Sequence, residues 1–125
     1  MFMNTITKLS EAIRVGSIGV KQGFGSRSLY SDTSPCVLGM ARIALGIESN
    51  VYDTLKEKFP YLRDDYVKER HGSLPEDIID NLTPSSSSLL SVCWLLNDAA
   101  KQTPDQIADW VESIEKDFVE KDLLS

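Results

Sequence analysis

Residues 34–46 read Ser34-Pro35-Cys36-Val37-Leu38-Gly39-Met40-Ala41-Arg42-Ile43-Ala44-Leu45-Gly46. Ser34 and Pro35 are typical of a helix start, because a hydroxyl can cap the first turn and proline at the first helical position loses no hydrogen bond. Gly46 is typical of a helix end. Arg42 is the one charged residue between them. A helix that is apolar nearly all round belongs in the interior. We therefore expect residues 35–45 to form a buried central helix.

Other segments repeat the helical pattern on either side of this one. Apolar residues recur at helical spacing in residues 5–15, 50–59, 75–82, 89–96 and 103–118. The expected N-terminal caps are Asn4 or Thr5, Asn50, the serines at 85–88, and Thr103, which starts a capping box with Gln106. No period-two strand pattern is found. The sequence predicts a compact all-α domain, residues 1–125, of about five to seven short helices with a glycine-rich loop or small hairpin.

Composition and charge limit the function classes. The 125 residues carry 13 basic and 19 acidic side chains, a formal net charge of −6. Residues 1–63 have a balance of +3 and residues 64–125 a balance of −9. The acidic half argues against direct binding of nucleic acid and fits either a solvated surface or a basic protein partner. We find no membrane span or signal peptide, and two isolated cysteines, so a cytoplasmic location is expected.

A glycine-rich segment at residues 16–31 departs from helical patterning. Gly16, Gly19, Gly23 and Gly25 fall within ten residues, and Lys21, Ser26 and Arg27 lie among or beside them. Such a loop could hold a small phosphorylated or nucleotide ligand, because glycine backbone approaches anions closely and basic side chains complete the site. It lacks the spacing of a P-loop or of a dinucleotide fold. The alternative is a plain connection between two helices.

Two further groups of polar residues are candidate sites. Asn97 and Asp98 end an apolar helix, where they could support the structure by bonding backbone groups, or Asp98 could face the glycine-rich loop as a site carboxylate. The last helix has a predicted acidic outer face that could bind a partner: Asp109, Glu112, Glu115, Asp117 and Glu120.

Catalytic and metal-binding patterns are missing from the sequence. His71 is the single histidine, and Cys36 and Cys93 lie in apolar helical patterns, where a thiol is shielded. One histidine with two distant cysteines gives no zinc spacing. We expect no catalytic residue, no metal and no cofactor.

Four motifs resemble a family of small uncharacterised helical proteins of bacteria and phages. They are the glycine-containing loop, Cys36-Val37-Leu38-Gly39, Trp94-Leu95-Leu96-Asn97-Asp98 and Thr103-Pro104-Asp105-Gln106-Ile107. The family pattern is Cys-x-Leu-Gly-Ala-Leu, Trp-x-Asn-Asp and Thr-x-x-Gln-Ile/Val. Here Met40-Ala41 replaces Ala-Leu, and an extra leucine precedes Asn97. The resemblance covers about 60 residues, and it implies a helical fold and a phage-like origin without an assigned activity.

The expected function is therefore that of a non-catalytic acidic protein, encoded by a phage or mobile element, that occludes a basic surface on a host protein. The alternative is a binding module for a small anionic ligand at the glycine-rich loop. The acidic face of the last helix, together with the acidic clusters around residues 64–80, would carry the first function. Lys21, Gly23, Gly25, Ser26, Arg27, Asn97 and Asp98 would carry the second.

Overall fold

The computed structural model describes residues 6–63, 74, 78 and 89–118. In these residues the chain forms five α-helices, two short 3₁₀ helices and no strand. The elements are α1 (Leu9–Gly16), η2 (Ser26–Tyr30), α2 (Val37–Leu45), α3 (Val51–Lys58), η3 (Pro60–Arg63), α5 (Leu89–Asp98) and α6 (Pro104–Phe118). The predicted all-α fold is confirmed. The predicted helix over 75–82 and the serine caps at 85–88 lie outside the described residues, apart from Ile78, which is buried.

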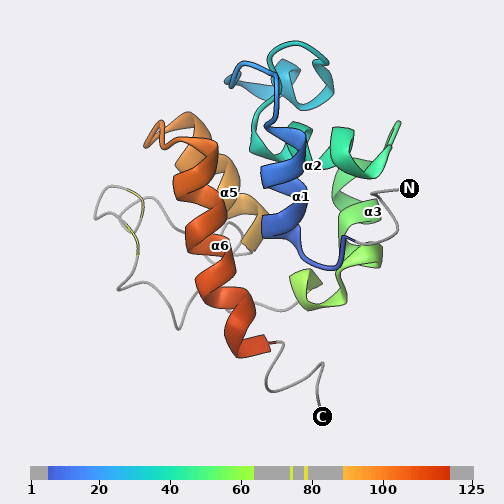
Figure 1. Cartoon of the computed structure of the whole chain (residues 1–125), viewed down its shortest axis with the longest axis vertical. Helices are drawn as coiled ribbons and strands as arrows, with labels where there is room; N and C mark the ends of the chain where they lie inside the picture. The colour runs from blue at the N-terminus through green and yellow to red at the C-terminus, as the bar shows by residue number, and fades with distance from the viewer. Residues whose placement is uncertain (1–5, 64–73, 75–77, 79–88, 119–125) are drawn as a thin grey trace.

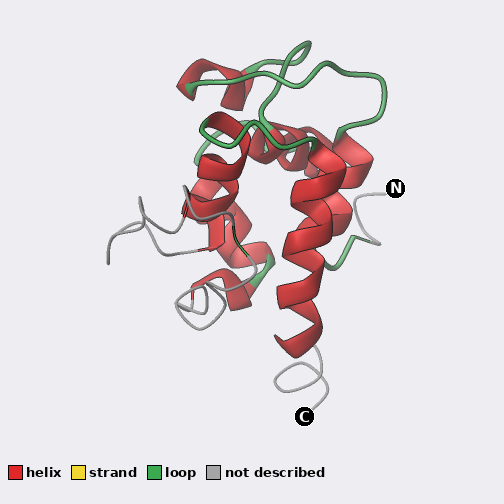
Figure 2. Ribbon diagram, turned by 90° about the vertical axis from the view of Figure 1, so that its left-hand side faces the viewer, coloured by secondary structure: helices red, strands yellow, loops and turns green. Residues whose placement is uncertain are grey.

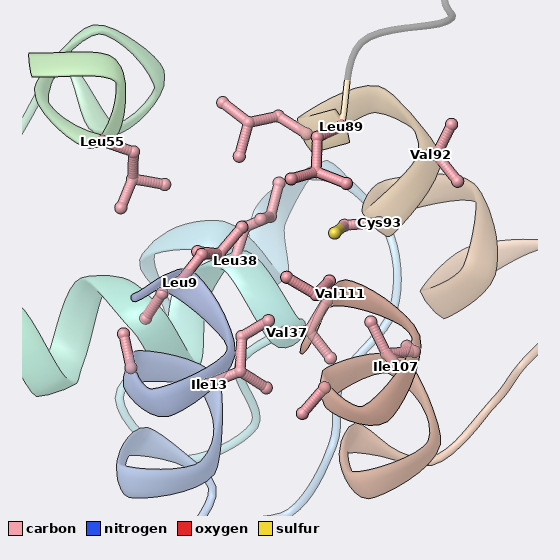
Figure 3. Close-up of a cluster of buried hydrophobic side chains, with 14 of the residues drawn as sticks. Leu9, Ile13, Val37, Leu38, Leu55, Leu89, Val92, Cys93, Ile107 and Val111 are labelled. Carbon is pink, nitrogen blue, oxygen red and sulfur yellow. The ribbon is translucent and has the colours of Figure 1, made fainter. Parts of the chain in front are cut away.

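The central position of α2 is confirmed by its burial and its contacts. It packs against α1 and α5, and α1 and α5 both pack against α6 (Figure 1). Val37, Leu38, Met40 and Ala41 of α2 have no exposed surface, whereas Ala44 and Leu45 near its C-terminus are only partly buried. The labelled side chains around Val37 and Leu38 in Figure 3 come from α1, α3, α5 and α6, namely Leu9, Ile13, Leu55, Leu89, Val92, Cys93, Ile107 and Val111.

A close approach of two backbones explains why residue 16, the last residue of α1, is glycine. A Cβ atom at this position would lie 1.8 Å from the carbonyl oxygen of Met40 in α2. Any side chain there would force the two helices apart. The glycine therefore sets the distance between the end of α1 and the middle of α2.

One helix starts as expected, and the starts of three others differ. The α6 capping box is confirmed: Thr103 N–H donates to Gln106 Oε1 at 2.9 Å, and Gln106 N–H donates to Thr103 Oγ1 at 3.2 Å. The expected local caps of three other helices are wrong. α2 begins at Val37, two residues after Pro35. α1 begins at Leu9, with no capping side chain from the N-cap residue Lys8.

Asn50 takes a left-handed conformation instead of capping α3 with its side chain. The starts of α1 and α2 are completed by polar side chains from the C-terminal helices. These long-range caps involve Glu115 and Asn97 and are described below.

Candidate functional site

The glycine-rich segment crosses one end of the helix bundle, at the top of Figures 1 and 2. Its first part runs beside the residues that lead into α2. Lys21 N–H donates to the Thr33 carbonyl at 3.3 Å, and Gly23 N–H donates to the Pro35 carbonyl at 2.9 Å. A Cβ atom at Gly23 would lie 1.8 Å from the Ser34 carbonyl oxygen, so glycine is required where the two runs meet. The segment then turns into η2.

Asn97 holds this segment and α2 together. Its side chain is fully buried. Its Oδ1 accepts hydrogen bonds from Val37 N–H, at 3.1 Å, and from Gln22 Nε2, at 2.8 Å. Its Nδ2 donates to the Gly23 carbonyl at 3.0 Å. A single amide from α5 therefore caps α2 and fixes the path of the glycine-rich segment, which agrees with the structural role considered for Asn97.

Asp98 faces the glycine-rich segment, as one of the two interpretations of the sequence requires. Its Oδ1 accepts from Gly25 N–H at 3.1 Å and from Asn97 Nδ2 at 2.8 Å. The structure thus brings Asn97 and Asp98 together with Gly23 and Gly25. Lys21 and Arg27 are exposed. The side chain of Ser26 lies outside the described residues.

Three backbone donors of this segment are already bonded within the protein. The N–H groups of Lys21, Gly23 and Gly25 are all donated to protein acceptors. At Gly25 the acceptor is a carboxylate, which already occupies the position that an anion would take and would repel it. The geometry therefore gives little support to a phosphate-binding loop at these residues.

A small apolar pocket lies between η2, α3 and α5, beside the Asp98–Gly25 contact. It is lined by Gly25, Leu29, Cys36, Tyr52 and Trp94 and encloses about 240 Å³. Its aromatic walls are open to solvent, since Tyr52 is 40% and Trp94 is 38% exposed. We call this site the aromatic pocket. It is composed of residues from four separate segments of the chain.

The sequence interpretation missed the aromatic pocket. Two local signals were present. Tyr52 lies off the buried stripe that Val51 and Leu55 of α3 form with Phe59, the residue after the helix. Trp94 and Asp98 are also four residues apart on α5, which places them on one face of the helix. Neither signal predicts a pocket without the fold.

The pKa of Tyr52 reflects burial and the carboxylate of Asp98. The pKa of Tyr52 is raised above its ordinary value of 10.0, first by burial and then by Cys36, Asp98 and Tyr30. Among these neighbours, Asp98 is the carboxylate. The surroundings of the pocket therefore disfavour a further negative charge.

Two cations lie near the pocket, each already engaged with an aromatic ring. Lys101 Nζ is 4.3 Å from the ring centre of Phe24. The guanidinium carbon of Arg42 is 5.7 Å from the ring centre of Tyr30, and this group also forms an ion pair with Asp32 at 2.9 Å. Phe24 and Tyr30 adjoin the pocket residues Gly25 and Leu29 in sequence. Aromatic rings in this part of the molecule thus already attract cations.

The acidic outer face predicted for the last helix is largely engaged within the protein. Arg14 of α1 forms ion pairs with Asp109 and with Glu112, both at 2.6 Å. The placement of Glu115 on this face is wrong, because Glu115 has no exposed surface. Asp117 lies in α6 but its side chain is outside the described residues, and Glu120 is outside them altogether.

Glu115 instead caps α1. Its Oε2 accepts Leu9 N–H at 2.8 Å and Ser10 N–H at 3.4 Å, and Ser10 Oγ donates to its Oε1. A carboxylate is stabilised at this position by the N–H groups of the first turn and the positive end of the helix dipole. The burial of Glu115 therefore has a structural cause, and this residue is unavailable to a partner.

Nucleophilic chemistry gains no support from the described residues. Both cysteines are unpaired and buried. The pKa of Cys93 is strongly raised by burial, and further by Glu115 and Cys36, which keeps this thiol protonated. His71 lies outside the described residues. Within the described part of the chain, no three potential metal-binding side chains lie together.

Comparison of the chain with models of protein families, with curated proteins and with solved structures finds no match. The likeness to small helical proteins of bacteria and phages stays a resemblance of short motifs. Among the helices that the structure describes, none combines the length and the apolar character needed to cross a bilayer.

Proposed function

We propose that this chain is a non-catalytic binding protein that docks onto a basic protein partner, with the aromatic pocket as its point of contact. The observation that supports this proposal is the open pair of aromatic walls, Tyr52 and Trp94, around about 240 Å³ of apolar space. Half-exposed tryptophan and tyrosine side chains are costly to leave in water and are enriched in the energetic centres of protein interfaces.

The size of the pocket favours a side chain over a nucleotide. Sites for small molecules and cofactors typically enclose roughly 300–1,000 Å³. The aromatic pocket, at about 240 Å³, is below that range. A single side chain of a docked protein fits it better. The alternative of a phosphorylated ligand is also disfavoured by Asp98, which accepts the Gly25 N–H at the pocket edge.

The charge of the chain favours a basic partner. Its net charge of −6 attracts a positive surface at long range and speeds the encounter. The acidic residues of α6 contribute to this field although Arg14 partly neutralises Asp109 and Glu112. An acidic protein bound in this way would cover the basic surface and exclude other acidic ligands from it, as an inhibitor does.

An array of immobilised random peptides tests the proposal without knowledge of the partner. The full chain is labelled and applied to the array, together with Trp94→Ala and with the matched control Val15→Ala. Val15 is exposed to the same extent, 38%, and lies outside the pocket. We expect the wild type to select basic peptides, Trp94→Ala to lose them and Val15→Ala to keep them.

The same array separates this site from the two predicted from the sequence. If the double variant Asp109→Asn/Glu112→Gln no longer binds the selected peptides while Trp94→Ala still does, binding belongs to α6. That result would contradict the role of the pocket. Selection of no peptide, together with a rise in melting temperature on adding nucleotides that Lys21→Ala abolishes, would favour the small-ligand function. Selection of acidic or neutral peptides would contradict the basic partner.

A further inference from the structure

We infer that the aromatic pocket receives one alkylammonium group, the side chain of a lysine on the partner protein. This inference rests on the proposed function and gives the chemistry of its central contact. It follows from the walls of the pocket, from the charge beside it and from the hydrogen bonds that Asp98 already makes.

The walls of the pocket suit a cation on an apolar stem. Leu29 and the rings of Tyr52 and Trp94 offer apolar surface to the methylene groups of a lysine. The faces of tyrosine and tryptophan attract an ammonium group within about 6 Å of the ring centre. The protein already makes two such contacts nearby, Lys101 on Phe24 and Arg42 on Tyr30.

The charge beside the pocket favours a cation over a neutral group. Asp98 follows Trp94 by one helical turn, and its Oδ1 binds the N–H of Gly25, which is itself a lining residue. Asp98 is also the carboxylate among the groups that raise the pKa of Tyr52. Lys101 and Arg42, the cations on the rings of Phe24 and Tyr30, each have a second partner: Lys101 donates to the Asp98 carbonyl, and Arg42 pairs with Asp32.

Lysine fits this arrangement better than arginine. Arginine binds carboxylates best through two parallel hydrogen bonds, one to each oxygen. One oxygen of Asp98 already accepts two hydrogen bonds within the protein, from Gly25 N–H and Asn97 Nδ2. A guanidinium group therefore cannot bind both oxygens of Asp98 at once. An ammonium group acts as a point charge and needs no such geometry.

Capped amino acids test the inference on the full chain. The probes are N-acetyl methylamides of lysine, trimethyl-lysine, arginine and norleucine, and norleucine supplies the apolar stem without the charge. Trp110→Phe removes the buried tryptophan, so that Trp94 alone reports binding by its fluorescence. A thermal melt checks that this variant is folded. We expect lysine to bind about five- to thirtyfold more tightly than norleucine, the ratio that a partly desolvated cation–aromatic contact supplies.

Variants of the pocket then assign the effect to the cation. Tyr52→Leu keeps apolar volume and removes the ring, so it should weaken lysine binding severalfold and leave norleucine unchanged. Tyr52→Phe is its matched control and should retain lysine binding. Asp98→Asn keeps an oxygen that can accept the Gly25 N–H while removing the charge, and it should weaken lysine but not norleucine.

The possible failures are distinguishable. If norleucine binds as tightly as lysine, the pocket requires no positive charge and is an apolar docking pocket. If arginine binds more tightly than lysine, the assignment to lysine is wrong. If no probe changes Trp94 fluorescence while Trp94-dependent selection of basic peptides persists, the inference fails and the proposed function stands. If the array also selects nothing, both fail.

Discussion

The side chain of Asn97 completes a helix that begins 60 residues earlier in the chain, because its Oδ1 accepts the backbone N–H of Val37 at 3.1 Å. The first N–H groups of a helix have no partner within the helix, and most helices satisfy one of them with a residue just before the first turn. Here the partner comes from α5. The start of the central helix therefore depends on the docking of a second helix.

Replacing Asn97 by leucine, which has similar volume and no polar atoms, should destabilise the protein by about 2–4 kcal/mol. The reason is that Val37 N–H and the Gly23 carbonyl would be left buried without their partner. Thr103→Ala is the comparison, since it removes an exposed local cap that is worth about 1 kcal/mol. Denaturant unfolding measures both. An Asn97→Leu loss no larger than that of Thr103→Ala would show that the long-range cap is unimportant.

Glu115→Ala should destabilise the protein by about 2–4 kcal/mol, because it removes a buried charged acceptor from Leu9 N–H and Ser10. Glu112→Ala is the matched control on the same helix. Glu112 is half-exposed and its ion pair with Arg14 should contribute less than about 1 kcal/mol. Denaturant midpoints of the two variants give the comparison, and equal losses would contradict the capping role of Glu115.

Gly16→Ala should destabilise the protein by about 3 kcal/mol or prevent folding, because the new Cβ would lie 1.8 Å from the Met40 carbonyl oxygen. Gly19→Ala meets nothing within 4 Å, but Gly19 has a positive φ of 77°, so its cost should be about 1–2 kcal/mol. Both substitutions restrict the unfolded chain equally. The difference between their losses of stability therefore reports the clash at residue 16. Thermal melts rank the two, and the reverse order would refute the close approach of α1 and α2.

Alkaline pH should destabilise the protein. The pKa of Cys93 is raised in the folded state above its ordinary value of 9.0, and that of Tyr52 above 10.0. Above those values the unfolded chain releases protons that the folded chain keeps, so the free energy of unfolding falls as pH rises. The loss should approach about 1.4 kcal/mol per pH unit for the buried Cys93 thiol and be smaller for the partly exposed Tyr52. Between pH 9 and pH 10, the free energy of unfolding of Cys93→Ala should fall less steeply with pH than that of the wild type. An unchanged slope would contradict the burial of the Cys93 thiol.

The fold was predictable where its cause is local. The periodicity of residues 37–45 predicts a buried helix, and Thr103 and Gln106 predict the start of α6, because those interactions involve residues a few positions apart. The caps of α1 and α2 were not predictable in this way, since their partners lie 106 and 60 residues further along the chain. Side chains from another helix replaced the local candidates.

The error over Glu115 has a different origin. Position 115 is four residues after Val111 and eight after Ile107, and so it falls within the apolar stripe of α6. Its charge favours exposure, whereas its spacing predicts burial. The aromatic pocket could not be found at all from the sequence, because Leu29, Cys36, Tyr52 and Trp94 come from separate segments that only the fold brings together.

The cap that Glu115 gives to Leu9 also bears on how the protein is made. A ribosome releases α1 and α2 into solution well before it has joined the residues that complete their first turns. During that interval the first turns of the two helices lack Glu115 and Asn97, and the apolar surface that α5 and α6 cover is exposed. Folding of the newly made chain therefore waits for α5 and α6, and a translation product that stops after η3 would lack both caps and be a substrate for cellular proteases.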